Sequence, residues 1–338
     1  MNGRVRDRFA AALLGCAIGD ALGAPFEGVR ARRMREVPDL LGGFRPHRGL
    51  PPGQYTDDTQ LTLATAESLA ACRGVNGRDM AERMSRFWRE RTIVGGGASC
   101  RDAMRSYLRG TPWEECGTEE GRAGNGTAMR ASPLGLWFWD EPEEIPEAAR
   151  VNALITHRDP RCAAGSAAVA RVVAHAVERG ARAEGSRALR SGFLAVDRSE
   201  TVELAAGAAE VHDPEFAGYI RELPRWLTLP EEEALGEIAA AGWEPGSKGL
   251  DFITGFVVPT VLAALFFFLW KPGDFKGAVE GALRAGGDVD TVASIVGALT
   301  GALGGMACLP PPLAEGVKDA SAIRVLGERL FEAKGGGR

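Results

Sequence analysis

The sequence predicts an all-α protein that forms one compact domain of many helices. Apolar, alanine-rich segments recur with the spacing of amphipathic helices, and no segment alternates with the period of two that is typical of strands. Stretches rich in Val, Ile and Thr between turn signals are nearly absent, which argues against βαβ folds and β-sandwiches. The expected helices are Phe9–Leu22, Gln60–Ala71, Ala81–Arg89, Ala131–Trp139, Ala163–Val177, Val261–Trp270 and Val292–Leu303.

Length and composition are those of a globular protein. The chain has 338 residues, of which 45% are hydrophobic and 25% charged, so it is long enough for a sizeable core. Connections such as RGLPPGQY at 48–55 carry Gly and Pro, but none resembles a flexible interdomain linker. We therefore expect a single domain over residues 1–338, with a frayed tail over 330–338.

The charge balance limits the partners. Lys and Arg number 40 and Asp and Glu 45, and the net charge of −5 does not suit a surface that must neutralise the phosphates of a nucleic-acid duplex. The first apolar segment contains Asp7 and Asp20 and lacks a cleavage pattern, so we interpret it as the first helix rather than a signal peptide. The apolar run at 256–270 falls short of the roughly 20 residues that span a bilayer and predicts a buried helix, not a membrane segment.

The cysteines indicate a reducing compartment. All six are scattered through the chain without a CxxC pair. This distribution argues against both a zinc site and a disulfide scaffold. We therefore expect a cytoplasmic protein.

Two short segments place carboxylates and hydroxyls where a loop enters an apolar helix. They are Tyr55-Thr56-Asp57-Asp58-Thr59 and Gly286-Gly287-Asp288-Val289-Asp290-Thr291. Taken singly, each is explained by helix capping, because Thr and Asp satisfy the free N–H groups of a first turn and the helix dipole favours an acid there. If the fold brings the two segments together, however, four carboxylates would repel one another without cations.

Such a cluster would suit hard divalent ions. Ligands that are all oxygen favour Mg²⁺, with Mn²⁺ as the second candidate, and carboxylates shared by two ions form the usual dinuclear hydrolytic site. Zinc is disfavoured because the four histidines, His47, His157, His175 and His212, form no paired-ligand motif. The sequence thus predicts a dinuclear centre in a cleft at helix N-termini, with capping as the alternative.

Six segments carry a family resemblance in matching order over nearly the whole chain. They are GCAIGDALGAPFE (15–27), YTDDTQLTL (55–63), GNGTAMRASPLG (124–135), ITH (155–157), TGFVVPTV (254–261) and AGGDVDTVASIVGALTGALGG (285–305). Together they resemble the ADP-ribosylglycohydrolase family, which includes the dinitrogenase reductase-activating glycohydrolase and the eukaryotic ADP-ribosylhydrolases. The resemblance implies an all-α fold with two Mg²⁺ or Mn²⁺ ions and hydrolysis of the bond between C1 of the distal ribose and a modified side chain.

The resemblance also assigns roles to residues. The implied metal ligands are Thr56, Asp57, Asp58, Asp288, Asp290 and Thr291. Glu27 and Asp288 are the implied catalytic residues, and Glu27 matches a glutamate that can close over the metals and transfer a proton or orient water. The implied substrate-binding residues are Gly97, Ser99, Gly121, Ala123, Gly124, Asn125, Gly126, Thr127, Met129, His157 and Phe256. The alternatives that the residues alone leave open are a solvated acid for Glu27, a helix-entry turn for the glycine-rich loop at 121–127, and core positions for His157 and Phe256.

Two departures from the family pattern bear on the substrate. Members that act on ADP-ribosyl-arginine commonly carry Asp-Ile-Gly where this chain has Gly95-Gly96-Gly97. The glycine-rich loop is closer to the branch that acts on serine-linked ADP-ribose, poly(ADP-ribose) or O-acetyl-ADP-ribose, so we expect these acceptors in preference to arginine. The family's Tyr-Val-Val-Asp-Thr is replaced by residues 256–260, FVVPT, so the adenosine contacts are expected to differ.

Three functions are compatible with these patterns. They are a Mg²⁺-dependent ADP-ribosylhydrolase, a binder of ADP-ribose without turnover, and a two-metal hydrolase of another nucleotide derivative. The complete metal motif favours the first. The expected partners are ADP-ribose and an ADP-ribosylated protein or small molecule, and the chain is expected to be a monomer.

Overall fold

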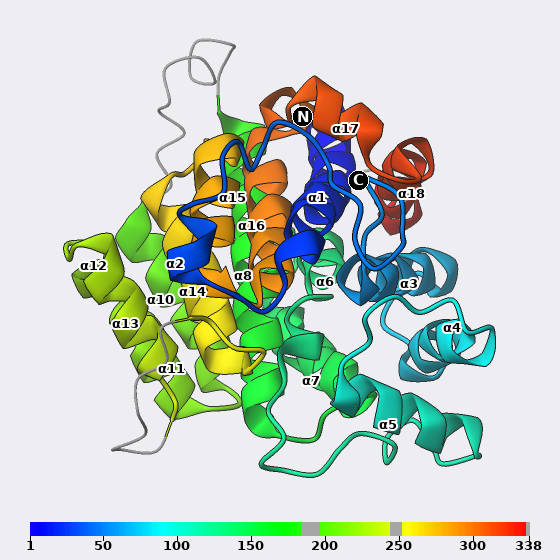
Figure 1. The fold of residues 1–338 in the computed structure, drawn as a ribbon. Coiled ribbons are helices and arrows are strands. Elements are labelled where there is room, and N and C mark those ends of the chain that lie inside the picture. Colours follow the sequence, from blue (N-terminus) through cyan, green and yellow to red (C-terminus); the bar gives the residue numbers. More distant parts are fainter. Residues whose placement is uncertain (184–196, 244–251, 336–338) are drawn as a thin grey trace.

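The centre of the fold is a pair of helices from opposite ends of the chain. The computed structural model describes residues 1–183, 197–243 and 252–335. Within it, α1 (Asn2–Gly23) lies along α16 (Val289–Gly304), and α8 (Pro160–Arg182) packs against both (Figure 1). All three are almost entirely buried in their middle turns.

The remaining helices surround this centre (Figure 1). Those of the first half are α2 (Ala31–Met34), α3 (Asp57–Cys72), α4 (Gly77–Arg89), α5 (Ala98–Leu108), α6 (Ser132–Trp137) and α7 (Ile145–Leu154). Those of the second half are α10 (Arg198–Glu210), α11 (Pro214–Arg221), α12 (Leu223–Trp226), α13 (Glu231–Ala240), α14 (Val257–Trp270), α15 (Phe275–Arg284), α17 (Pro311–Gly316) and α18 (Ala320–Lys334). Short 3₁₀ turns are η1 (Ala24–Phe26), η2 (Asn125–Thr127), η3 (Pro142–Glu144) and η4 (Met306–Cys308).

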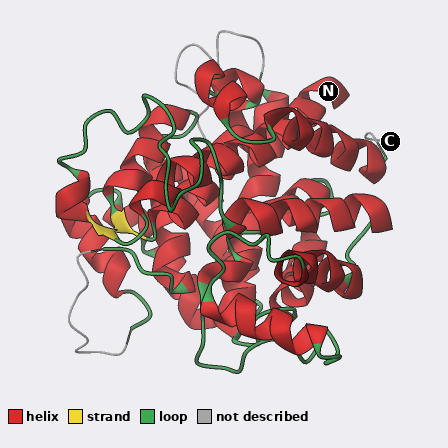
Figure 2. Cartoon of the chain, turned by 45° about the vertical axis from the view of Figure 1, so that its right-hand side comes forward, coloured by secondary structure: helices red, strands yellow, loops and turns green. Residues whose placement is uncertain are grey.

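A two-stranded antiparallel sheet is the one sheet in the described residues, and the sequence analysis did not predict it (Figure 2). It pairs β1 (Val29–Arg30) with β2 (Gly286–Gly287), and the Gly28 N–H donates to the Gly287 carbonyl at 2.8 Å. Two-residue strands that include adjacent glycines give no alternating pattern. Their pairing ties the segment after Glu27 to the segment before Asp288.

The structure confirms the all-α prediction. Each expected helical segment falls on an observed helix, although Ala131–Trp139 was drawn too long because α6 ends at Trp137. The apolar run at 256–270 forms α14, whose residues are buried up to Leu269. One described segment, Asn2–Phe26, is long and apolar enough to cross a membrane, but 89% of its apolar window is buried inside the domain.

The predicted frayed tail, residues 330–338, includes residues that are helical in the structure. Residues 330–334 form the last turn of α18, where Leu330 is buried and the Phe331 ring meets the Phe9 ring edge-on at 5.5 Å. This aromatic contact explains why the helix continues to Lys334. Residues 336–338 lie outside the described part of the chain.

Glycines set the distance between α1 and α16. A Cβ added at Gly15 would meet the backbone carbonyl of Gly297, and one at Gly19 would meet the carbonyl of Ala293. From the other side, a Cβ at Gly301 would meet the carbonyl of Ala11. The two backbones are therefore in direct contact, which only residues without a side chain allow.

Replacing Gly15 with Ala is expected to lower the free energy of unfolding by about 1–3 kcal/mol, because the added methyl group forces two buried backbones apart. Urea unfolding measures the change. The control is Gly207→Ala on the exposed face of α10, where a Cβ has nothing within 4 Å. That substitution should raise stability by up to about 1 kcal/mol through helix propensity. Equal stability of the two variants would contradict the packing argument.

Candidate metal centre

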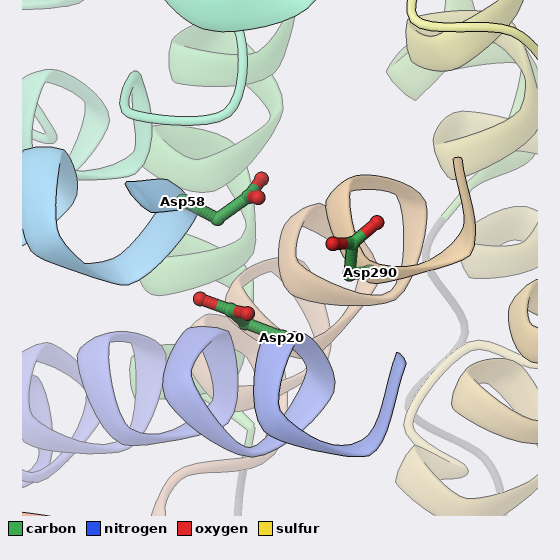
Figure 3. Close-up of side chains that lie close together, drawn as sticks. All are labelled: Asp20, Asp58 and Asp290. Atoms are coloured by element: carbon green, nitrogen blue, oxygen red, sulfur yellow. The ribbon is translucent and has the colours of Figure 1, made fainter. Parts of the chain in front are cut away.

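Three buried acids from three helices meet at the centre of the fold. Asp20 lies near the end of α1, Asp58 in the first turn of α3 and Asp290 in the first turn of α16. One carboxylate oxygen of each lies within 4.8 Å of the others, and their side chains point toward one another (Figure 3). The fold therefore brings together the two acidic segments, which are more than 200 residues apart in the sequence.

Asp20 is the member that sequence reasoning missed. Its carboxylate accepts hydrogen bonds from the Thr56 N–H at 3.0 Å, the Thr59 N–H at 3.0 Å and the Thr59 hydroxyl at 2.6 Å. It thus takes up free N–H groups at the N-terminus of α3, where Thr56 is the N-cap. The sequence does contain an indication, because a lone acid in an apolar helix needs a partner. The sequence analysis used Asp20 as an argument against a signal peptide and did not predict it as a ligand.

Two oxygen atoms of this cluster have no partner in the described structure. Asp58 Oδ1 and Asp290 Oδ1 are both buried and accept no hydrogen bond. Unpaired buried carboxylate oxygens are costly unless a cation or a proton neutralises them. Since every nearby ligand atom is a carboxylate or hydroxyl oxygen, the residues present fit a hard divalent cation.

A second group of acids adjoins the first. Glu27, Asp288 and Asp290 also place one oxygen each within 4.8 Å of one another, so Asp290 belongs to both groups. Asp288 occupies the N-cap position of α16, yet its side chain makes no capping bond. It accepts instead from Asn125 Nδ2 at 2.6 Å. Capping alone therefore does not explain the second acidic segment.

Burial raises the pKa of the acids in the first group. It raises the pKa of Asp20 to about 7, although hydrogen bonds from Thr59 and Thr56 oppose the change. Burial, together with the charges of Asp288 and Asp58, raises the pKa of Asp290 well above its usual range. Burial raises the pKa of Asp58 in the same way. Protons and cations would therefore compete for this cluster.

Asp57, an expected ligand, belongs to neither group of three. Its carboxylate accepts from the backbone N–H groups of Gly96 and Gly97, and burial raises its pKa to about 6. Gly95 has a φ of +84°, and a Cβ there would lie 2.6 Å from Asp57 Oδ1. The loop of three glycines thus wraps around this acid, which gives a physical reason for glycine at position 95.

The acids open into a cleft of about 500 Å³. Fourteen predicted site residues line it: Glu27, Thr56, Asp57, Asp58, Gly97, Ser99, Gly124, Asn125, Gly126, Met129, His157, Asp288, Asp290 and Thr291. The cleft is large enough for a small-molecule ligand. All six expected metal residues therefore face one space, with the glycine-rich loops in its wall.

The other four predicted substrate residues do not line this cleft. The Gly121 N–H donates to Asp159 at 2.8 Å, and the Ala123 carbonyl accepts from the Val257 N–H at 2.9 Å. The Thr127 hydroxyl donates to the Cys162 carbonyl at 2.7 Å. The Phe256 ring packs against Trp243, with centroids 5.0 Å apart, and the Arg161 guanidinium lies 5.2 Å from its centre. The contacts of these four residues therefore lie outside the lining of the cleft, and Gly121 is exposed.

His157 is held in the wall as a neutral side chain. Its Nδ1 lies 2.8 Å from the Thr156 hydroxyl, and burial lowers its pKa to about 3. Behind it lies Arg130, which is fully buried and donates at 2.8 Å to the Gly126 carbonyl and to the Thr156 hydroxyl. Arg130 was not predicted, because an arginine next to an apolar helix carries no sign of burial in the sequence. It fixes the turn that presents Gly126.

Eleven lining residues were not predicted as site residues, and two of them, Arg48 and Cys100, have ionisable side chains. Arg48 donates to Glu27 Oε2 at 2.7 Å and is the one Lys or Arg in the lining among the described residues. Cys100 is buried, and burial raises its pKa to about 11, so it stays a thiol at neutral pH. The cleft therefore has many acids, one cation and no activated nucleophilic sulfur.

Comparisons with known proteins identify relatives over the full length of the chain. The family model described as ADP-ribosylglycohydrolase matches residues 1–338. The ADP-ribosyl-[dinitrogen reductase] glycohydrolase of Rhodospirillum rubrum is 28% identical, covering 90% of this chain and 88% of the relative. The ADP-ribosylhydrolase ARH3 of Danio rerio is also 28% identical, covering 96% and 90%. A solved structure, an ADP-ribosylglycohydrolase-related protein complex, is 29% identical with a TM-score of 0.72, covering 98% and 99%.

The stabilisation that a divalent cation gives is expected to grow with pH. In the metal-free fold the pKa of Asp20 is about 7 and that of Asp57 about 6, against about 3.9 for an unfolded chain. The folded chain therefore holds protons that the unfolded chain has lost, and it loses stability as the pH rises through this window. A bound cation displaces those protons, so its binding strengthens over the same window.

The measurement is the difference in Tm between Mg²⁺ and EDTA samples, taken from about pH 5.5 to about pH 8. Taking the difference cancels the opposite effect of the buried histidines, whose lowered pKa values act equally in both samples. A difference that stays constant with pH would show that the cation does not bind at these acids.

Replacing Asn125 with Ala is expected to weaken divalent-cation affinity by about 10- to 100-fold, because Asp288 loses the amide that orients it. Titration calorimetry with Mn²⁺ measures the affinity. Asn76→Ala is the matched control, since Asn76 caps α4 through Asp79 and touches neither group of acids. It should lower stability but leave the affinity unchanged. Equal affinity in both variants would rule out this role for Asn125.

Proposed function

Because the chain belongs to the ADP-ribosylglycohydrolase family, and is therefore a hydrolase of the glycosidic bond to ADP-ribose, we propose that it works with Mg²⁺ on serine-linked or O-acyl ADP-ribose or poly(ADP-ribose). Arginine-linked ADP-ribose would be the poorer substrate. The observation that supports the metal requirement is the pair of acidic groups that share Asp290 and open into the cleft. A bound cation would give a partner to the two unpartnered oxygens, Asp58 Oδ1 and Asp290 Oδ1.

Residues Asp20, Asp58 and Asp290 would hold one ion, and Glu27, Asp288 and Asp290 a second. When bound, two Mg²⁺ ions would supply Lewis-acid polarisation of the ribose hydroxyls and of the attacking water. Thr56 and Thr291 would add hydroxyls beside Asp58. The chain's part is to orient these acids and to keep them out of bulk water, while the cations would displace the protons that burial favours.

The ADP half of the substrate would lie along the glycine-rich wall. Gly124 and Gly126 have no side chain between their backbone and the cleft, and a Cβ at either would crowd the His157 ring. Backbone groups can therefore approach the diphosphate closely. A neutral His157 can donate or accept a hydrogen bond there without adding charge.

Glu27 is the group best placed to move a proton. Among the acids of the two groups its side chain is the most exposed, at 40%, whereas Asp20, Asp58 and Asp290 are buried. It lies where the cleft meets solvent and where the acceptor would depart. It can therefore take a proton from the attacking water or give one to the leaving group, as carboxyl groups do in glycoside hydrolysis.

The preference for hydroxyl-linked acceptors rests on the glycine loop. The dinitrogen reductase and ARH3 relatives are equally similar to this chain, at 28% each, so identity does not choose between their substrates. Residues 95–97 follow a path around Asp57 that a side chain at position 95 would block. In a relative with Asp at position 95, the backbone of this loop would need a different conformation. The surface that the loop presents to the substrate would then differ as well.

We further propose that the protein works in the cytoplasm. All six cysteines are free, and four of them are buried. Free thiols persist in a reducing compartment.

Substituting Asn for Asp290 is expected to lower the hydrolysis rate by at least about a hundredfold, because the one acid common to both groups loses its charge. Purified protein is incubated with matched peptides that carry serine-linked or arginine-linked ADP-ribose, in Mg²⁺ or in EDTA, and released ADP-ribose is quantified. Glu315→Gln removes an exposed acid that does not line the cleft and serves as the control.

The outcomes separate the candidate functions. Release that needs Mg²⁺ and fails with Asp290→Asn supports the proposal, and full activity of that variant or in EDTA would refute the metal role. Binding of ADP-ribose without release from any linkage would indicate a non-catalytic binder. Release of phosphate or a mononucleotide from a phosphoester, without ADP-ribose, would indicate another two-metal hydrolase.

A further inference from the structure

Arg48 lies in a tight turn at the edge of the cleft. The turn that carries it is closed by the His47 N–H to the Leu50 carbonyl at 3.3 Å and the Leu50 N–H to the His47 carbonyl at 2.7 Å. Arg48 has a φ of +47° and Gly49 a φ of +77°, which is the pattern of a type I′ turn. Such a φ is uncommon for a residue with a side chain. The tight turn therefore sets the direction in which the Arg48 side chain leaves the backbone.

The direction is toward Glu27. The guanidinium of Arg48 donates to Glu27 Oε2 at 2.7 Å, and both side chains line the cleft. The other charged lining residues are all acids: Asp57, Asp58, Asp288 and Asp290. Arg48 is thus the positive charge that a bound molecule meets at this end of the cleft.

A series of contacts connects the glycine-rich wall to Arg48 through the acids. Asn125, which lies between Gly124 and Gly126, donates to Asp288 at 2.6 Å. An oxygen of Asp288 lies within 4.8 Å of one of Glu27, the partner of Arg48. If the ADP half occupies the wall formed by Gly97, Gly124 and Gly126, as the proposed function requires, the acceptor extends past the acids toward Glu27. The acceptor then leaves beside Arg48.

We infer that Arg48 is a residue that determines acceptor specificity: its guanidinium disfavours a cationic acceptor and favours a neutral or anionic one. This inference rests on the proposed function and names its substrate class by charge. ADP-ribosylated arginine is a substituted guanidinium and brings a positive charge next to Arg48. A serine, an acyl group or a further ADP-ribose unit brings no positive charge, and the last brings negative phosphates.

The ion pair with Glu27 adds to the effect of the Arg48 charge, because both disfavour a cationic acceptor. While the pair is intact, a cationic acceptor cannot use Glu27 as its own partner. When Arg48 is removed, Glu27 becomes free to attract that acceptor. Both side chains are partly solvated, at 58% and 40% exposure, so the effect is moderate and sensitive to salt.

The test is the ratio of kcat/KM for matched serine-linked and arginine-linked ADP-ribosyl peptides. Arg48→Gln is expected to lower this serine-to-arginine ratio by about three- to tenfold, mainly through faster cleavage of the arginine-linked peptide. Arg48→Glu should lower it further, and Arg48→Lys should retain most of it. The difference between wild type and Arg48→Gln should shrink at high salt, which a purely structural role for Arg48 would not predict.

Arg45→Gln is the matched control. Arg45 lies on the same loop, but it packs over Phe26 at 5.2 Å and donates to the Pro38 carbonyl instead of lining the cleft. It should leave the ratio unchanged. Each variant is first compared with wild type for Tm and for its Mg²⁺-induced Tm shift, and Arg48→Lys gives a folded comparison if Arg48→Gln is unstable.

An unchanged ratio in both Arg48→Gln and Arg48→Glu, with wild type active, overturns the inference and leaves the proposed function standing. A wild-type preference for the arginine-linked peptide also overturns it. If wild type releases ADP-ribose from neither linkage, the proposed function fails and the inference fails with it.

Discussion

Close packing of α1 against α16 is the constraint on which the site depends. With glycine at 15 and 19, the helix backbones touch, and Asp20, the residue after Gly19, comes within reach of Asp290 in the first turn of α16. Asp20 then accepts hydrogen bonds from Thr56 and Thr59, which places the start of α3 and adds Asp58 to the cluster. The contacts that fold the chain are therefore the same contacts that assemble the acids. A change in helix spacing would alter all three positions at once.

This arrangement makes the metal-free fold electrostatically strained. Hydrogen bonds compensate Asp20, but Asp58 Oδ1 and Asp290 Oδ1 have no partner in the described structure. Arg130 is a buried cation, yet its guanidinium is occupied by the Gly126 carbonyl, Asn152 and Thr156. A cation bound by the acids would relieve this strain and stabilise the folded state by mass action. Stability and catalysis would then depend on the same ion.

The features that could be predicted were those with a local sequence pattern. Helical spacing located the core helices, and the two acidic segments located most of the cluster because each combines acids with a helix start. Asp20 was missed because its role depends on the N-terminus of another helix. The β1–β2 pair was missed because four residues give no period. Arg48, in the cleft lining, and Arg130, buried behind it, were missed because their contacts join separate segments of the chain, to Glu27 and Thr156 respectively.

The two ends of the cleft differ in how they are built, and this difference bears on specificity. The end proposed for the nucleotide is held by buried groups, since Arg130 donates to the Gly126 carbonyl and His157 contacts Thr156. The end proposed for the acceptor is formed by a partly exposed pair, Glu27 and Arg48, in the segment between α1 and α3. Buried networks tolerate few substitutions, whereas surface loops tolerate many. Acceptor choice can therefore change through a residue such as Arg48 while the acids and the nucleotide wall stay as they are.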